Sequence, residues 1–150
     1  MKVRSGLVIA ILSMSFWNAP EAVSAEPTGS AARPPESWSA NQDALKAAPK
    51  NHRVLLENAE LRVLLVTLQP GEREPLHHHR WPSIMIINAL PKMIDYDKAG
   101  KEIPLPPMPE KLELPLVLRL PPQPLHSIHD VDTKPFQAIR IEYKKGYPVN

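Results

Sequence analysis

Proline is the feature that most limits how this chain can fold. The 150 residues contain 19 prolines, and eight of them fall within residues 104–124. Proline lacks the backbone N–H that a helix interior requires, so residues 104–124 cannot form a long helix. A strand in this region must be short or lie at a sheet edge, and residues 116–120 are the best candidate.

Several short strands are predicted after residue 51. Residues 62–67 alternate between two faces, with Arg62, Leu64 and Val66 on one and the residues between them on the other. Leucine-rich runs also suit helices, but the short lengths and the turn signals between them favour strands. The predicted strands are 52–57, 60–69, 83–88, 92–97, 116–120 and 136–144, with a hairpin turn at 98–101. The fold class is therefore all-β, a sandwich or a barrel.

The N-terminus has the pattern of a secretory signal peptide. Lys2 and Arg4 precede an apolar run over residues 7–17, which is shorter than the roughly 20 residues needed to span a bilayer. Small residues at 23 and 25 predict cleavage after Ala25, and a periplasmic or secreted location. An uncleaved membrane anchor is the alternative. The predicted organisation is a signal peptide over 1–25, a flexible Ala/Pro/Ser-rich linker over 26–50 with a helical turn near 43–48, and one domain over 51–150.

Composition excludes some partners. The chain has a formal net charge of +2, and cleavage after Ala25 would remove two basic residues and one acidic residue, leaving +1. A nearly neutral protein has no electrostatic basis for binding nucleic acid or, once the signal is cleaved, an anionic membrane. The chain has no cysteine, so no disulfide braces the fold and the core must supply its stability.

Histidines are the candidate functional residues. Residues 70–82 read PGEREPLHHHRWP. On a strand, His77 and His79 point to one face and His78 to the other, so the first two can chelate one metal ion. A third ligand must come from elsewhere, and His126 follows the last prolines where a loop enters a late strand. His52 is interpreted as structural, and His129 as a surface residue or a partner that orients a ligand.

The histidine spacing resembles the cupin superfamily, in particular small single-domain cupins of the conserved-barrel type. Gly71-x5-His77-x-His79 matches the start of the first cupin motif, and Pro121-x-Gln123-x-x-His126-x-x-x-Asp130 resembles a degenerate second motif. The resemblance implies a double-stranded β-helix, which is a jelly-roll-like barrel with a metal in one mouth. It also implies that His77, His79 and His126 are the metal ligands.

The sequence departs from the cupin pattern at one expected ligand. The family's glutamate should fall at 83 or 84, where this chain has Ser83 and Ile84. Without that carboxylate, three neutral imidazoles leave the charge of a divalent ion uncompensated. Three-histidine sites are nevertheless chemically competent, and some cupin dioxygenases hold iron in this way. Glu72 and Glu74 lie near the histidines in sequence and are alternative carboxylates.

These observations lead to one hypothesis and one alternative. The hypothesis is an exported, small cupin-like protein that binds a divalent metal (Fe, Mn, Ni, Zn or Cu) through three histidines and acts as a metal-dependent, dioxygenase-like enzyme on a small molecule. The alternative is a non-catalytic module without metal that binds a small ligand or forms a homodimer. No nucleophile motif and no general base can be identified, so the sequence assigns no catalytic residue and leaves enzymatic activity open.

Overall fold

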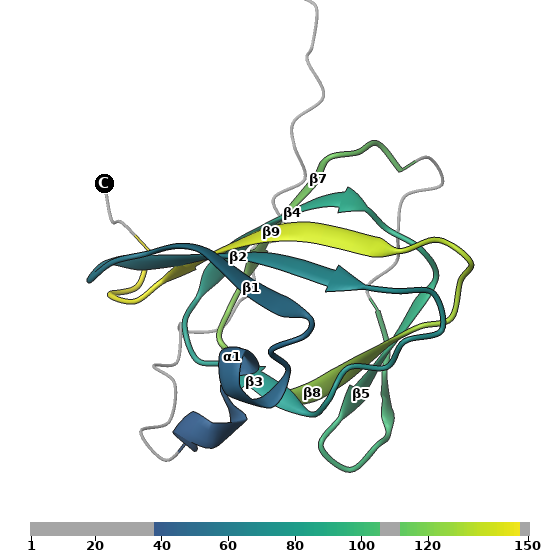
Figure 1. The fold of residues 1–150 in the computed structure, drawn as a ribbon, viewed down its shortest axis with the longest axis horizontal. Helices are drawn as coiled ribbons and strands as arrows, with labels where there is room; N and C mark the ends of the chain where they lie inside the picture. Colours follow the sequence, from purple (N-terminus) through teal and green to yellow (C-terminus); the bar gives the residue numbers. More distant parts are fainter. Residues whose placement is uncertain (1–37, 106–111, 148–150) are drawn as a thin grey trace, which may run out of the picture.

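Two antiparallel sheets form the part of the chain that the computed structural model describes, residues 38–105 and 112–147 (Figure 1). A five-stranded sheet has the order β1-β2-β9-β4-β7, and a four-stranded sheet has the order β3-β8-β5-β6. The elements are η1 (Ala40–Gln42), α1 (Ala44–Ala47), β1 (His52–Glu57), β2 (Leu61–Leu68), β3 (His77–His79), β4 (Ser83–Ala89), β5 (Met93–Asp97), β6 (Glu102–Ile103), β7 (Leu116–Leu120), β8 (Gln123–Asp130) and β9 (Phe136–Tyr143). The all-β prediction is confirmed.

The predicted strands agree closely with those observed, and the main difference lies at β8. Pro121 and Pro122 precede β8, whereas Pro124 lies inside it. The pairing of β3 with β8 joins His77 to His126 and His79 to Gln123, with an irregular register between the two pairs. Pro124 occupies this irregularity, where a ladder hydrogen bond is not required. A proline therefore sits within an eight-residue strand without breaking the sheet.

The interior of the barrel changes from apolar to polar along the strands. Inward-facing residues of β2 pair with those of β9 in four successive layers: Leu68 with Phe136, Val66 with Ala138, Leu64 with Arg140, and Arg62 with Glu142. The apolar end forms the hydrophobic core, which consists of Leu64, Val66, Leu68, Ile87, Phe136 and Ala138. The polar end is equally buried. The inward-facing residues of β2 and β9 thus contribute to the hydrophobic core at one end of the barrel and to the buried polar interior at the other.

The N-terminal part of the described chain packs against the barrel. Within the predicted linker 26–50, Asp43 caps α1 by accepting a hydrogen bond from the Leu45 backbone N–H at 3.1 Å. Ala44 and Ala48 are buried. Residues 38–50 are therefore packed structure rather than flexible chain, because α1 buries its alanines and Asp43 forms an ion pair with the barrel residue Arg62. The predicted signal peptide over 1–25 lies outside the described residues.

The described helices are short. Neither helix within residues 38–105 and 112–147 is long and apolar enough to cross a membrane.

The core arrangement predicts a large stability loss for Leu64→Ala. Leu64 is fully buried, so removing its side chain should lower the free energy of unfolding by about 3 kcal/mol through lost burial and a residual cavity. The matched control is Leu56→Ala, because Leu56 is 55% exposed on the same sheet and its loss should cost less than about 0.5 kcal/mol. Equilibrium urea unfolding measures both, and equal losses would contradict this placement of the core.

Candidate metal centre

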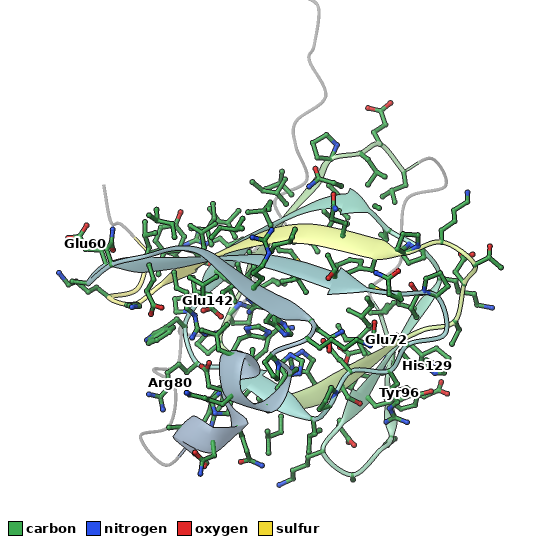
Figure 2. The ribbon with its side chains drawn as sticks, viewed as in Figure 1. Glu60, Glu72, Arg80, Tyr96, His129 and Glu142 are labelled. Carbon is green, nitrogen blue, oxygen red and sulfur yellow. The ribbon has the colours of Figure 1, made fainter. Side chains whose placement is uncertain are left out.

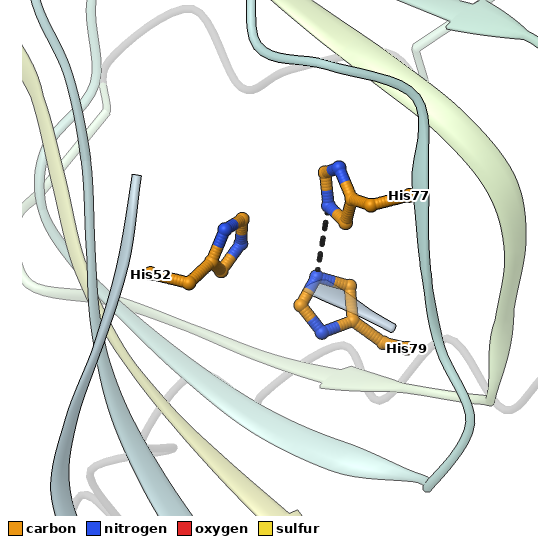
Figure 3. A group of neighbouring side chains, drawn as sticks. All are labelled: His52, His77 and His79. Carbon is orange, nitrogen blue, oxygen red and sulfur yellow. Dashed lines mark hydrogen bonds between the residues drawn. The ribbon is translucent and has the colours of Figure 1, made fainter. Parts of the chain in front are cut away.

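Four histidines converge inside the polar end of the barrel. His52 comes from β1, His77 and His79 from β3, and His126 from β8. Each is at most 4% exposed. The His77 ring centroid lies 4.7 Å from that of His52, 5.0 Å from that of His79 and 4.6 Å from that of His126. Figure 3 shows the rings of His52, His77 and His79 pointing toward one another from opposing strands.

The ring nitrogen Nδ1 of each of these histidines is held by a hydrogen-bond acceptor. The Nδ1 of His52 contacts the Ala48 carbonyl oxygen at 3.1 Å. The same atom of His77 contacts the Pro75 carbonyl oxygen at 2.9 Å, and that of His126 contacts the Pro124 carbonyl oxygen at 2.8 Å. A carbonyl oxygen can only accept, so Nδ1 carries the proton in these three rings. Nε2 is then the nitrogen with a free lone pair.

His79 is oriented in the same way by a carboxylate. Its Nδ1 donates to Oε1 of Glu142 at 2.7 Å. Glu142 is fully buried and lies between the two sheets (Figure 2). A buried carboxylate behind an imidazole fixes the ring and raises its basicity, which is the arrangement found behind histidines that bind metals. All four rings therefore present Nε2 as a potential ligand.

Two of the free nitrogens face each other directly. His77 Nε2 and His79 Nε2 are 3.2 Å apart, and both are hydrogen-bond acceptors once Nδ1 is protonated. Two lone pairs at this distance repel each other unless a cation lies between them. Nitrogen ligands about 2.1 Å from one ion are about 2.9–3.4 Å apart for bond angles between octahedral and tetrahedral. The observed separation thus suits joint coordination of a single ion.

Two groups of potential ligands meet the distance requirement for a metal within the described residues. One consists of His52, His77 and His79, and the other of Glu74, His77 and His126; in each, the ligand atoms lie within 4.8 Å of one another. His77 belongs to both groups. Of the predicted trio, His77 therefore groups with His79 and His52 on one side and with His126 and Glu74 on the other, whereas the His79 and His126 rings lie 5.8 Å apart and share neither group. The interpretation of His52 as structural was incomplete, because β1 turns its ring into the cluster.

The added carboxyl group has an unusual protonation equilibrium. Burial raises the pKa of Glu74 to about 8. Its Oε1 lies 3.8 Å from His77 Nε2, and its Oε2 is buried without a hydrogen-bond partner among the described residues. The Glu74 carboxyl therefore holds a proton near neutral pH unless a cation displaces it. Glu72 instead lies at the surface and pairs with Lys50.

A chain of ion pairs supports the histidine cluster from behind. The Nε of Arg62 donates to Oε2 of Glu142 at 2.5 Å, and its Nη1 and Nη2 donate to the two carboxylate oxygens of Asp43 at 2.9 and 3.2 Å. Burial alone would raise the pKa of Asp43, but the hydrogen bonds and charge of Arg62 outweigh this and lower it. The N-terminal segment is thereby connected through Arg62 and Glu142 to His79.

The other two histidines do not join the cluster. His78 points away from it, as the alternation predicts, but it is buried rather than solvated. Its Nε2 contacts the Ser39 carbonyl oxygen at 2.8 Å, and its ring lies 5.0 Å from that of Trp38. His129 lies partly exposed on β8, at the end of the barrel where Glu72 and Tyr96 also lie (Figure 2). The outward histidine of the triplet thus anchors the N-terminal segment.

A repeated tripeptide in the sequence corresponds to this geometry. The tripeptide Pro-Leu-His occurs twice, at 75–77 and 124–126. In both copies the histidine Nδ1 bonds the carbonyl oxygen of the proline two residues earlier. The two histidines are also direct partners in the β3–β8 pairing. No comparable signal pointed to His52 or Glu142, whose roles depend on which strand faces lie inside.

Comparison with known proteins rests on structure. No family model matches the sequence, and no curated protein matches it. A cupin domain from Bordetella pertussis is 16% identical with a TM-score of 0.50, over 62% of this chain and 91% of that one. The chain has the cupin fold. An RmlC-like cupin family protein with a double-stranded β-helix fold from Methanocaldococcus jannaschii is 14% identical with a TM-score of 0.44, over 63% of this chain and 81% of that one.

The cupin barrel differs from the family's motif at Ser83. Ser83 is fully buried on β4 opposite Glu142, and its hydroxyl has no hydrogen-bond partner within the described residues. A serine is too short to replace a carboxylate ligand. The additional groups at the cluster are instead His52, at the start of β1, and Glu74, in the segment between β2 and β3. Neither stands at the position of the motif's glutamate.

The histidine cluster predicts that the metal-free protein loses stability in mild acid. Burial lowers the pKa of His77 and His126 to about 3 and that of His52 to about 4. Between about pH 4 and the unfolded value of 6.5, the unfolded chain binds protons that the folded protein excludes. The free energy of unfolding should therefore fall as the pH drops through this window, by on the order of 1 kcal/mol per pH unit for each histidine.

Glu74 contributes with the opposite sign. Its raised pKa means that the folded protein binds an extra proton between pH 4.5 and about 8, so its contribution falls as the pH rises. The histidines outnumber it below pH 6.5, which places maximum stability near that pH. Urea unfolding with a chelator at pH 4.5–8 measures the profile. His126→Gln should make the acid limb shallower by about one proton, and an unchanged slope would contradict the assignment.

Proposed function

We propose that this cupin binds one divalent metal ion through Nε2 of His77, His79 and His126, with His52 supplying the fourth imidazole. The observation that carries the proposal is the 3.2 Å contact between the unprotonated Nε2 atoms of His77 and His79. Hydrogen bonds to Nδ1 hold all four rings with Nε2 available. The histidines are neutral near pH 7, so a metal need not displace protons from them.

The imidazole ligands restrict which metal ions suit the site. Imidazole suits zinc, copper, nickel and iron, whereas manganese prefers oxygen ligands. Glu74 is the carboxyl closest to His77 Nε2 among the described residues and would lose its proton if it joined the ion. When bound, such an ion supplies a Lewis acid that polarises an oxygen-containing ligand. The four imidazoles themselves add no negative charge, so the ion retains most of its own.

A metal-dependent, dioxygenase-like enzyme is the second candidate function, and Glu74 is the feature that favours it. Its carboxyl group lies 3.8 Å from His77 Nε2 and is close enough to the cluster to exchange a proton with a bound substrate. The identity of the bound ion tests this candidate. Iron retains the dioxygenase hypothesis, whereas a protein that takes up zinc alone would contradict it and leave a binding module.

Metal content provides the direct test of the proposed site. Protein purified without a histidine tag should contain about one equivalent of a single metal by elemental mass spectrometry, or acquire it on titration. His77→Ala should lower the affinity at least 100-fold, because His77 belongs to both ligand groups. His78→Ala is the matched control, since His78 is an equally buried neighbour that faces the opposite side. Equal metal content in His77→Ala and the control would overturn the proposal.

Export and self-association are proposals that concern other parts of the molecule. We propose that residues 1–25 are removed during export, leaving Glu26 as the first residue. Intact-mass measurement of protein from the extracytoplasmic fraction should show this, and a chain that begins at Met1 would contradict it. The homodimer stays a prediction. It is favoured by an aliphatic outer face on the five-stranded sheet, where Ile84 pairs with Ile141 and Ile86 with Ile139, all partly exposed.

A further inference from the structure

Arg140 is a buried cation with unused donors beside the histidines. It lies on β9 with its side chain inside the barrel, and the residue is 1% exposed. Its Nη1 donates to Oε1 of Gln123 at 2.5 Å, and Gln123 is the partner of His79 in the β3–β8 pairing. Its Nε lies 3.6 Å from Oε1 of Glu142, which is beyond hydrogen-bond distance. Neither Nε nor Nη2 has a hydrogen-bond partner within the described residues.

The contrast with Arg62 shows how unusual this is. Arg62 is also buried, but Nε, Nη1 and Nη2 all donate to the carboxylates of Asp43 and Glu142. Glu142 already accepts from Arg62 and from His79. With Glu142 held by these two bonds, Arg140 Nε stays 3.6 Å from its Oε1, outside hydrogen-bond distance. A buried guanidinium with two nitrogens that donate no hydrogen bond carries a desolvation cost that a bound acceptor would relieve.

The unpaired atoms of Arg140 have a specific hydrogen-bonding geometry. Nε and Nη2 form one lateral edge of the planar guanidinium, and their N–H groups project in parallel. This edge matches the two oxygens of a carboxylate in a bidentate pair. The residues beside Arg140 in the sheet are Leu64 on β2 and Met85 on β4. Apolar neighbours suit the carbon skeleton of an organic acid better than a fully polar ion such as phosphate.

The balance of charges at the site also favours an anionic ligand. Burial lowers the pKa of Arg140 to about 10, so the guanidinium is still positive at neutral pH. The charges of Asp43 and Glu142 are matched by Arg62 and Arg140, and the histidines are neutral. A divalent ion in the histidine cluster would leave this interior with a net positive charge. An anion that reaches both the ion and Arg140 would neutralise part of it.

We infer that the ligand of this site is a small organic carboxylate, bound through the Nε and Nη2 edge of Arg140 next to the histidine cluster. The inference deepens the proposed metal-binding function by naming the class of ligand. It does not require that the metal contact the carboxylate, because Arg140 offers the same two donors in the metal-free protein. Arg140 is thus a ligand-binding residue rather than part of the metal's ligand set.

Calorimetric titration tests the inference. Formate, acetate, oxalate and inorganic phosphate would be titrated into the purified protein with and without zinc, with acetamide as the uncharged analogue of acetate. We expect 1:1 binding of at least one carboxylate, and weaker or no binding of phosphate and acetamide. Arg140→Gln should weaken carboxylate binding by roughly 10- to 100-fold, the effect of losing a charge-assisted bidentate pair.

Two variants keep the test independent of folding. Arg140→Lys keeps the positive charge but loses the two parallel donors of the guanidinium. If the Nε and Nη2 edge binds the carboxylate, this variant should also weaken carboxylate binding at least tenfold. Arg119→Gln is the matched control, since Arg119 is an exposed arginine on β7 whose guanidinium stacks on Tyr147. Thermal melts would show which variants fold, so the lysine variant answers the question if the glutamine variant does not fold.

The outcomes separate this inference from the proposed function. Carboxylate binding that is unchanged in both Arg140 variants, binding of phosphate alone, or no binding of any probe would overturn the inference. Zinc titration of the same samples reports the histidine site separately, and the Arg140 variants should keep the metal. Loss of zinc binding in His77→Ala together with intact carboxylate binding in the metal-free protein would support both assignments.

Discussion

The polar end of this barrel depends on the buried pairing of Arg62 with Asp43 and Glu142. Arg62 satisfies two carboxylates at once, and one of them holds the His79 ring in position. Without Arg62, Asp43 would lose the cation it is paired with and Glu142 would keep only the longer 3.6 Å contact with Arg140, and buried charges that lose their partner are strongly destabilising. The same arginine attaches the N-terminal helix to β2 through Asp43. The Arg62 guanidinium therefore holds the N-terminal segment against the barrel and, through Glu142, fixes the orientation of His79, a candidate metal ligand.

The layered interior divides the work of folding and binding between the two ends of the same strands. Leu68 and Phe136 close the apolar end, where burial of hydrocarbon stabilises the fold. At the other end of these two strands, six residues away, the same inward faces carry Arg62 and Glu142. A group of buried imidazoles and ions costs desolvation energy, so the apolar end must offset it. The hydrogen bonds to each Nδ1 reduce that cost and at the same time preorganise the site.

The sequence predicted much of this fold because proline placement and strand alternation are local signals. Six strands, the hairpin at 98–101 and the shared face of His77 and His79 follow from those signals alone. Which face of a strand lies inside is not a local property, so the sequence does not place Arg140 and Glu142 in the interior, and it assigns His52 only a structural role. Their positions depend on how β1, β2 and β9 pair, through contacts between residues up to 82 positions apart. The packing of residues 38–50 depends in the same way on Arg62, which a composition rich in alanine and proline does not reveal.

The burial of the histidine triplet has a practical consequence for handling the protein. A run of three histidines suggests natural retention on immobilised nickel, but His77, His78 and His79 are each at most 2% exposed. One nitrogen of each ring bonds to a backbone oxygen or to a carboxylate, and a resin-bound ion cannot reach these buried rings in the folded barrel. Retention of the untagged chain on such a resin would therefore report opened or misfolded molecules, so the triplet is a built-in indicator of sample quality during purification.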